Sequence, residues 1–116
     1  MHSASYNGTH LLLDIAQIRN TELLNDMAAL SLLMECMVLQ LGYKILDKIE
    51  HQFSPQGCTI LFLLAESHFS IHTYPEHHRV AIDLYTCNGS EDLDVIAERL
   101  NQQLRGKIRL LWILPR

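Results

Sequence analysis

Residues 58–76 read CTILFLLAESHFSIHTYPE, and this stretch decides the predicted fold. Its first half is a short apolar run, which is typical of a buried strand. Its second half places hydroxyl, imidazole and carboxylate side chains directly beside that run. Such groups are costly at the edge of a core unless they are hydrogen-bonded or used in chemistry. Pro75 ends the second strand because it has no backbone N–H to donate. The stretch therefore predicts two consecutive strands that carry reactive side chains.

Four more strands are predicted outside this stretch. They are short apolar or alternating segments at residues 10–15, 43–53, 79–87 and 107–114. In the second of them, Ile45 and Ile49 are expected to face the core together, because alternate residues of a strand share a face. The turn at residues 54–57 is short, and short turns imply that consecutive strands pair antiparallel.

Two helices complete the pattern. Residues 27–41 are almost wholly apolar, so this helix should be covered on more than one side, for example by a second subunit, with Cys36 packed inside. The second helix is capped by Ser90 and ends at Gly106. Its apolar side chains form one stripe, made of Leu93, Ile96, Leu100 and Leu104.

These elements follow one another in the order β-α-β-β-β-β-α-β. That order predicts an α+β fold, a two-layer sandwich in which two helices cover one face of a mainly antiparallel sheet. The length of 116 residues, with 48% apolar and 19% charged side chains, is typical of a single globular domain, residues 1–116, with a polar start over residues 1–8. The other face of the sheet is expected to stay partly open.

The composition excludes several classes of partner. A formal net charge of −4 gives no basic surface for nucleic acid. The three cysteines are odd in number and irregularly spaced, which argues against a disulfide framework and favours a reducing compartment. The N-terminus lacks the basic and then apolar order of a signal peptide, and no apolar run approaches the roughly 18 residues of a membrane span. We therefore expect a cytoplasmic protein without nucleic-acid or membrane partners.

Seven histidines raise the question of a metal site. His68 and His72 would share one face of a strand, but zinc sites use three or four converging ligands, and no such spacing is present. We therefore expect no metal. Cys87 ends a predicted strand and precedes a turn, and two interpretations of it are open: an accessible nucleophile with His72 as its base, or a small buried thiol.

Three blocks of the sequence resemble one protein family, and they lie at residues 51–57, 64–76 and 81–87. Together they resemble the prokaryotic S-adenosylmethionine decarboxylase proenzymes, a pyruvoyl-dependent family, and the resemblance extends over residues 10–114. It implies a self-processing enzyme that converts S-adenosylmethionine to decarboxylated S-adenosylmethionine and CO₂ for polyamine (spermidine) biosynthesis. It also implies a homodimer of processed protomers with active sites built across the interface.

The resemblance implies a cleavage site inside the second block. Ser67 would attack the carbonyl of Glu66, and the chain would split between them into residues 1–66 and 67–116. The pyruvoyl group generated from Ser67 would be the cofactor. It forms a Schiff base with the substrate amine and takes up the electrons left behind by CO₂.

Three further residues receive roles from the resemblance. His72 corresponds to the base that drives β-elimination during processing, and Cys87 corresponds to the acid that reprotonates the α-carbon of the substrate. Thr59 stands where the family has a serine that assists processing, so a hydroxyl is kept at this position.

The resemblance also implies three substrate contacts. Phe53 and Tyr74 match the aromatic rings that hold the adenine, although the family usually has tryptophan at the second position, and Glu76 matches the carboxylate that binds the ribose. Because the chemistry needs only an α-amino acid, an arginine or ornithine decarboxylase of the same family is an alternative. An unprocessed, non-catalytic regulatory or binding homologue is the alternative of another class.

Overall fold

The computed structural model describes residues 8–87 and 93–116. The expected helix cap at Ser90 and the expected polar start, apart from Gly8, lie outside these residues. The strands are β1 (Thr9–Ala16), β2 (Ile45–Gln52), β3 (Cys58–Leu64), β4 (Ser67–Tyr74), β5 (Arg79–Thr86) and β6 (Lys107–Pro115). The helices are α1 (Met27–Gln40) and α2 (Leu93–Leu104), with short 3₁₀ turns η1 (Leu23–Asn25) and η2 (Pro75–His77).

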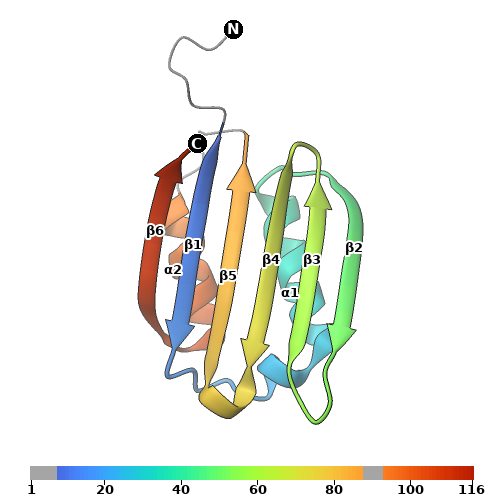
Figure 1. The fold of residues 1–116 in the computed structure, drawn as a ribbon, viewed down its shortest axis with the longest axis vertical. Coiled ribbons are helices and arrows are strands. Elements are labelled where there is room, and N and C mark those ends of the chain that lie inside the picture. The colour runs from blue at the N-terminus through green and yellow to red at the C-terminus, as the bar shows by residue number, and fades with distance from the viewer. Residues whose placement is uncertain (1–7, 88–92) are drawn as a thin grey trace, which may run out of the picture.

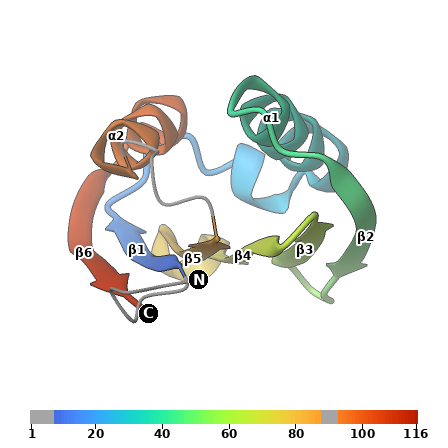
Figure 2. The same ribbon diagram turned by 90° about the horizontal axis from the view of Figure 1, so that it is seen from above.

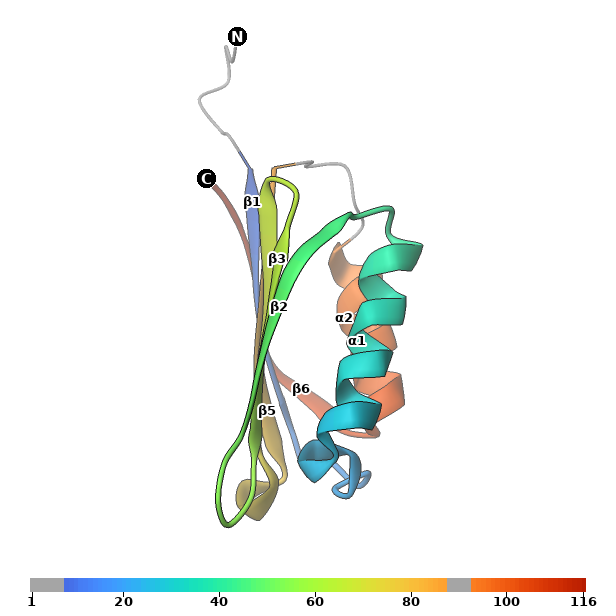
Figure 3. The ribbon, with the colours of Figure 1, turned by 90° about the vertical axis from the view of Figure 1, so that its right-hand side faces the viewer.

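The described strands form one antiparallel sheet in the order β2-β3-β4-β5-β1-β6 (Figure 1). Both helices pack on the same face of this sheet, and the opposite face is uncovered (Figures 2 and 3). The prediction of an α+β two-layer sandwich with the order β-α-β-β-β-β-α-β is therefore confirmed. In the part of the chain that the structure describes, no helix is both long enough and apolar enough to cross a membrane.

The core lies between the sheet and the helices. Alternate residues of the central strands point towards the helices and are buried. Phe62 of β3 and Phe69 of β4 occupy paired positions in this layer, with ring centroids 6.2 Å apart. The predicted stripe of α2 closes the same layer, and it consists of the buried side chains Leu93, Ile96, Leu100 and Leu104.

The prediction that Ile49 faces the core is wrong. Ile45 pairs with Leu64 on the helix side, but the register of β2 against β3 shifts between Ile45 and Asp47. An extra residue at such a bulge reverses the side on which the following residues lie. Ile49 therefore pairs with Leu61 on the uncovered face and is 62% exposed.

The prediction that Cys36 packs inside α1 is also wrong, because its side chain is exposed. Only one stripe of this helix, which includes Leu30 and Met34, faces the core. Cys36 lies off that stripe, as the 3.6-residue period of a helix requires. Leu32 and Leu39 are exposed as well, so the outer side of α1 is not covered within one chain.

Phe62→Ala is expected to lower the free energy of unfolding by about 3–5 kcal/mol, because it removes a fully buried ring and leaves a cavity. The comparison should be made in a Ser67→Ala background, which the sequence predicts to keep the chain whole, with urea unfolding followed by circular dichroism. Leu39→Ala, on the exposed side of α1, serves as the control and should change stability by less than about 1 kcal/mol. Equal losses in both variants would contradict the assigned core.

Candidate active site at the ends of the central strands

The turn between β3 and β4 holds the predicted cleavage site. Leu64 pairs with Ser67, so the turn contains only Ala65 and Glu66. Glu66 has φ of 64°, in the left-handed region that side chains other than glycine enter at a cost of about 1–2 kcal/mol. The strained residue is the one whose carbonyl Ser67 is predicted to attack.

Ser67 and Cys87 lie in the same pocket. Ser67, the first residue of β4, is 8% exposed and pairs with Thr86, the last residue of β5. Cys87 follows directly and is exposed, so the interpretation of Cys87 as a small buried thiol is wrong. The pocket has a volume of about 280 Å³ and is lined by Gly42, Tyr43, Lys44, Ala65, Glu66, Ser67 and Cys87.

A buried hydrogen bond lies beside this pocket. The Tyr43 hydroxyl donates to Thr86 Oγ1 at 2.7 Å. Since Thr86 is paired with Ser67 and precedes Cys87, this bond fixes the backbone that carries both residues. No local sequence pattern marks this hydrogen bond, because Tyr43 and Thr86 are 43 positions apart.

Thr59 and His72 form a second group. They are paired across β3 and β4, and Thr59 Oγ1 lies 3.0 Å from His72 Nδ1. Both side chains lie on the uncovered face, because the residues on either side of them point towards the helices. The family resemblance implies a processing role for each of these residues, and the structure brings the two side chains together.

The two groups do not meet within one chain. Ser67 and His72 lie on opposite faces of β4, since an odd number of positions separates them. Five positions along a strand also correspond to about 16 Å. The predicted base therefore does not reach the predicted nucleophile of its own chain.

The three predicted substrate contacts gather at the far end of the sheet. The β2–β3 and β4–β5 connections lie there, at the opposite end from the β3–β4 turn (Figure 1). Phe53 follows β2, is 47% exposed and has its ring edge-on to His51, with centroids 4.5 Å apart. Tyr74 ends β4 beneath the Arg79 guanidinium, 5.6 Å from the ring centroid, and the exposed Glu76 lies in η2.

A model of the family described as S-adenosylmethionine decarboxylase matches residues 9–111, which is most of the chain. The chain belongs to this family. It is 40% identical to an S-adenosylmethionine decarboxylase proenzyme of Symbiobacterium thermophilum over 87% of this chain and 76% of the relative. It is 39% identical to one of Prochlorococcus marinus over 86% of this chain and 79% of the relative. The crystal structure of adenosylmethionine decarboxylase from Aquifex aeolicus superposes with a TM-score of 0.86 at 28% identity, covering 97% of this chain and 92% of that one.

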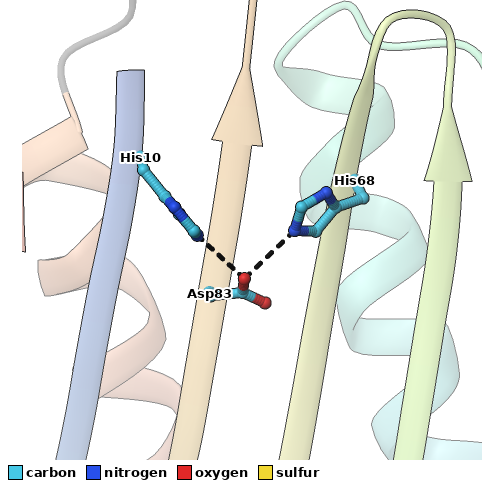
Figure 4. A group of neighbouring side chains, drawn as sticks. All are labelled: His10, His68 and Asp83. Carbon is cyan, nitrogen blue, oxygen red and sulfur yellow. Dashed lines mark hydrogen bonds and ion pairs between the residues drawn. The ribbon is translucent and has the colours of Figure 1, made fainter. Parts of the chain in front are cut away.

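This member of the S-adenosylmethionine decarboxylase family carries one polar cluster that sequence reasoning missed. His10 of β1 and His68 of β4 both point at Asp83 of β5, with their Nε2 atoms 2.9 and 3.0 Å from Oδ2 (Figure 4). The Ser70 hydroxyl donates to the other oxygen, Oδ1. Ligands close together in sequence are the usual signal of a metal site, and this cluster has none, because His10 and Asp83 are 73 positions apart.

The same contacts set the charge of Asp83. Partial burial raises the pKa of its carboxyl, but hydrogen bonds from Ser70, His10 and His68 outweigh burial and hold the pKa below the usual value of 3.8. The lowered pKa means that the folded state favours the carboxylate. The Asp83 carboxylate therefore stabilises the fold at pH values above the pKa that Asp83 has in the unfolded chain. This stabilisation is lost as the pH falls through the lower pKa that Asp83 has in the folded chain.

Proposed function

We propose that this chain is a self-processing, pyruvoyl-dependent decarboxylase that converts S-adenosylmethionine to decarboxylated S-adenosylmethionine and CO₂, for polyamine (spermidine) biosynthesis. The observation that carries the proposal is the pocket that holds Ser67 directly after a strained Glu66 and beside Cys87. A nucleophile, a strained acyl donor and a thiol acid are the groups that such an enzyme needs. The family membership supports the same reaction.

Processing is proposed to begin at Glu66. Ser67 Oγ attacks its carbonyl carbon, the peptide C–N bond breaks, and an ester replaces the amide. A base then removes the α-proton of residue 67, and the ester C–O bond breaks. The released Glu66 carboxylate becomes the end of the 1–66 fragment. The dehydroalanine left at position 67 takes up water and loses ammonia, which leaves a pyruvoyl group at the start of the 67–116 fragment.

The pocket fits a group made from Ser67. A volume of about 280 Å³ holds a three-carbon unit and leaves space for the reacting end of a substrate. The pyruvoyl group supplies the electron sink that decarboxylation of an α-amino acid requires. Cys87 borders the same space, and we assign its thiol to donate the proton that replaces the carboxylate.

His72 and Thr59 are proposed to act on the Ser67 of a second copy. His72 faces the uncovered side of the sheet and is about 16 Å along β4 from its own Ser67. A two-fold axis perpendicular to the strands would reverse the direction of the second sheet. The β3–β4 turn of one copy would then approach the far end of the other, where His72 and the substrate contacts lie. Each of two identical sites would be complete in a homodimer.

The uncovered face has the character of an interface. Large apolar side chains, each at least 39% exposed, project from it on strands at both edges and in between: Ile49, Leu61, Leu63, Trp112 and Leu114. A hollow of about 520 Å³, lined in part by His72, Leu61 and Leu110, lies among them. Apolar surface of this extent usually marks a contact with another molecule, and we assign it to a second copy of this chain.

In such a dimer, Phe53, Tyr74 and Glu76 of one copy would serve the pocket of the other. The two exposed rings would stack on the adenine and on the sulfonium cation, and the carboxylate would accept hydrogen bonds from ribose hydroxyls. Tyr74 presents a smaller ring than the tryptophan that the family usually has. All three positions lie at the end of the sheet that His72 approaches.

We place the protein in the cytoplasm. Cys36, Cys58 and Cys87 are all free thiols in the described structure. A free catalytic thiol and the absence of disulfides among these residues suit a reducing compartment.

Two measurements on the purified chain test the proposed function. Intact mass under denaturing conditions should show two fragments, residues 1–66 and 67–116, in place of one 13.3 kDa species. Release of CO₂ should occur with S-adenosylmethionine and not with arginine or ornithine. A full-length species that stays uncleaved for days would contradict self-processing, and release from arginine alone would contradict the assigned substrate.

A further inference from the structure

Three ligand atoms converge on the uncovered face of the sheet, away from the cleavage pocket. We propose that His10, His68 and Asp83 bind a late first-row divalent cation, with Zn²⁺ as its representative. The imidazole nitrogens and a carboxylate oxygen of these residues lie within 4.8 Å of one another (Figure 4). They come from three neighbouring strands, β1, β4 and β5, so the site is built by the sheet itself.

The spacing of the ligand atoms suits zinc. Zn–N and Zn–O bonds of about 2.0–2.2 Å at tetrahedral angles place ligand atoms roughly 3.3 Å apart. The two Nε2 atoms lie 2.9 and 3.0 Å from Asp83 Oδ2. The three ligand atoms lie within 4.8 Å of one another, so side-chain movements of up to about 1.5 Å would replace the two imidazole–carboxylate hydrogen bonds with three metal bonds.

The register of the strands explains this convergence. His10 and His68 are both paired with Tyr85, one from each side, and Asp83 lies two positions before Tyr85 in β5, on the same face. The carboxylate lies between the two imidazoles (Figure 4). Its Oδ1 accepts from the Ser70 hydroxyl, which leaves Oδ2 directed at the imidazoles, as an outer-shell partner orients a metal ligand.

A cation can enter and keep an open position. In a single chain, the side chain of His68 is 48% exposed, and the hollow of about 520 Å³ that we assign to the contact with a second copy borders both His68 and Asp83. A cation taken up by the single chain would therefore lie between the two sheets of the dimer, with its open position towards this hollow. Three protein ligands and a fourth, open position are the arrangement of catalytic zinc sites, whereas structural sites are closed by four protein ligands. Two imidazoles and a carboxylate favour Zn²⁺, Ni²⁺ or Cu²⁺ over Mg²⁺ and Ca²⁺, which prefer oxygen ligands.

One group opposes the cation. Arg116 Nη1 lies 3.1 Å from His10 Nδ1, so the guanidinium donates to this nitrogen and places a positive charge beside the site. With Nδ1 accepting, the proton of a neutral His10 lies on Nε2, where the metal would bind. Metal binding therefore requires Arg116 to withdraw, and removal of its side chain should strengthen binding.

Zinc titration of the full chain, freed of metal by a chelator, tests the site against a chromophoric competitor. We expect one Zn²⁺ per chain with micromolar or tighter affinity. His68→Ala and Asp83→Asn should each weaken binding at least tenfold, and Arg116→Ala should tighten it several-fold. His77→Ala, which removes an exposed histidine from η2, is the matched control and should have no effect.

Cobalt provides a readout that needs no variant. Co²⁺ bound by the three side chains should give the visible absorption of four- or five-coordinate cobalt, and Zn²⁺ should displace it. Absence of stoichiometric binding, or binding that His68→Ala and Asp83→Asn leave unchanged, would show that the cluster is a hydrogen-bonded network only. All three ligands belong to one chain, so chain cleavage and CO₂ release can fail or succeed independently of metal binding.

Discussion

Replacing Ser67 by alanine is expected to leave the chain whole and to abolish decarboxylation. The substitution removes the oxygen that would attack Glu66, and with it the atoms from which the pyruvoyl group would form. Glu66 keeps its left-handed conformation, so strain alone should not cleave the bond. Intact mass should show a single 13.3 kDa species, and CO₂ release from S-adenosylmethionine should fall to the level of a blank.

Cys87→Ala separates the two steps that Ser67→Ala removes together. Its thiol is assigned to protonation of the product, so cleavage should proceed and turnover should fall by about 10²- to 10⁴-fold, the usual contribution of a general acid. Cys36→Ala, which removes another exposed thiol on the outer side of α1, should change neither step. Cleavage that persists in Ser67→Ala would mean that another group, or a contaminating protease, cuts the chain.

Co-expression of Ser67→Ala chains with His72→Ala chains is expected to restore cleavage that neither variant shows alone. In a mixed dimer, the intact Ser67 of one chain meets the intact His72 of the other. Random pairing puts about half of each chain into mixed dimers, so about half of the His72→Ala chains should be cleaved. The Ser67→Ala chains should all stay whole. Intact mass distinguishes the two variants and their fragments.

The control pairs His72→Ala chains with chains that carry both substitutions. These dimers contain Ser67 but no His72, so no cleavage should appear. If His72 served its own chain, the first mixture would also stay uncleaved. The experiment thus separates a site shared between two chains from one contained in a single chain, and it does so without knowledge of the substrate.

Much of the fold follows from local patterns. The alternation in β3 and β5 and the stripe of α2 specify which side of each element meets the core, because burial and periodicity act along a single segment. The bulge in β2 could not be foreseen, since it depends on pairing with β3 and reverses Ile49 without any mark in the sequence. The exposure of Cys36 could not be foreseen either, since α1 is apolar nearly all round and its sequence does not mark which side meets the core.

The candidate site also has one part that local sequence predicts and another part that depends on strand pairing. Residue types and spacing around Ser67 carry the family likeness, so the candidate cleavage site could be proposed from sequence, and the structure places it at a two-residue turn. Its proximity to Cys87 depends on the register of β4 against β5, and the separation of His72 from Ser67 depends on which face of β4 each occupies. The Tyr43–Thr86 hydrogen bond and the cluster around Asp83 join residues that are far apart in the chain, and local pattern carries no information about them.

The order of the strands decides what would happen to the two fragments after the proposed cleavage between Glu66 and Ser67. Residues 1–66 contain β1, β2 and β3, and residues 67–116 contain β4, β5 and β6. Yet β1 lies between β5 and β6, and β3 lies beside β4, so each fragment supplies strands that the other needs. The halves are interleaved and should co-purify as one particle until a denaturant separates them. Once separated, they must find each other again by collision. Refolding of the mature protein should therefore depend on its concentration, whereas refolding of the precursor domain should not.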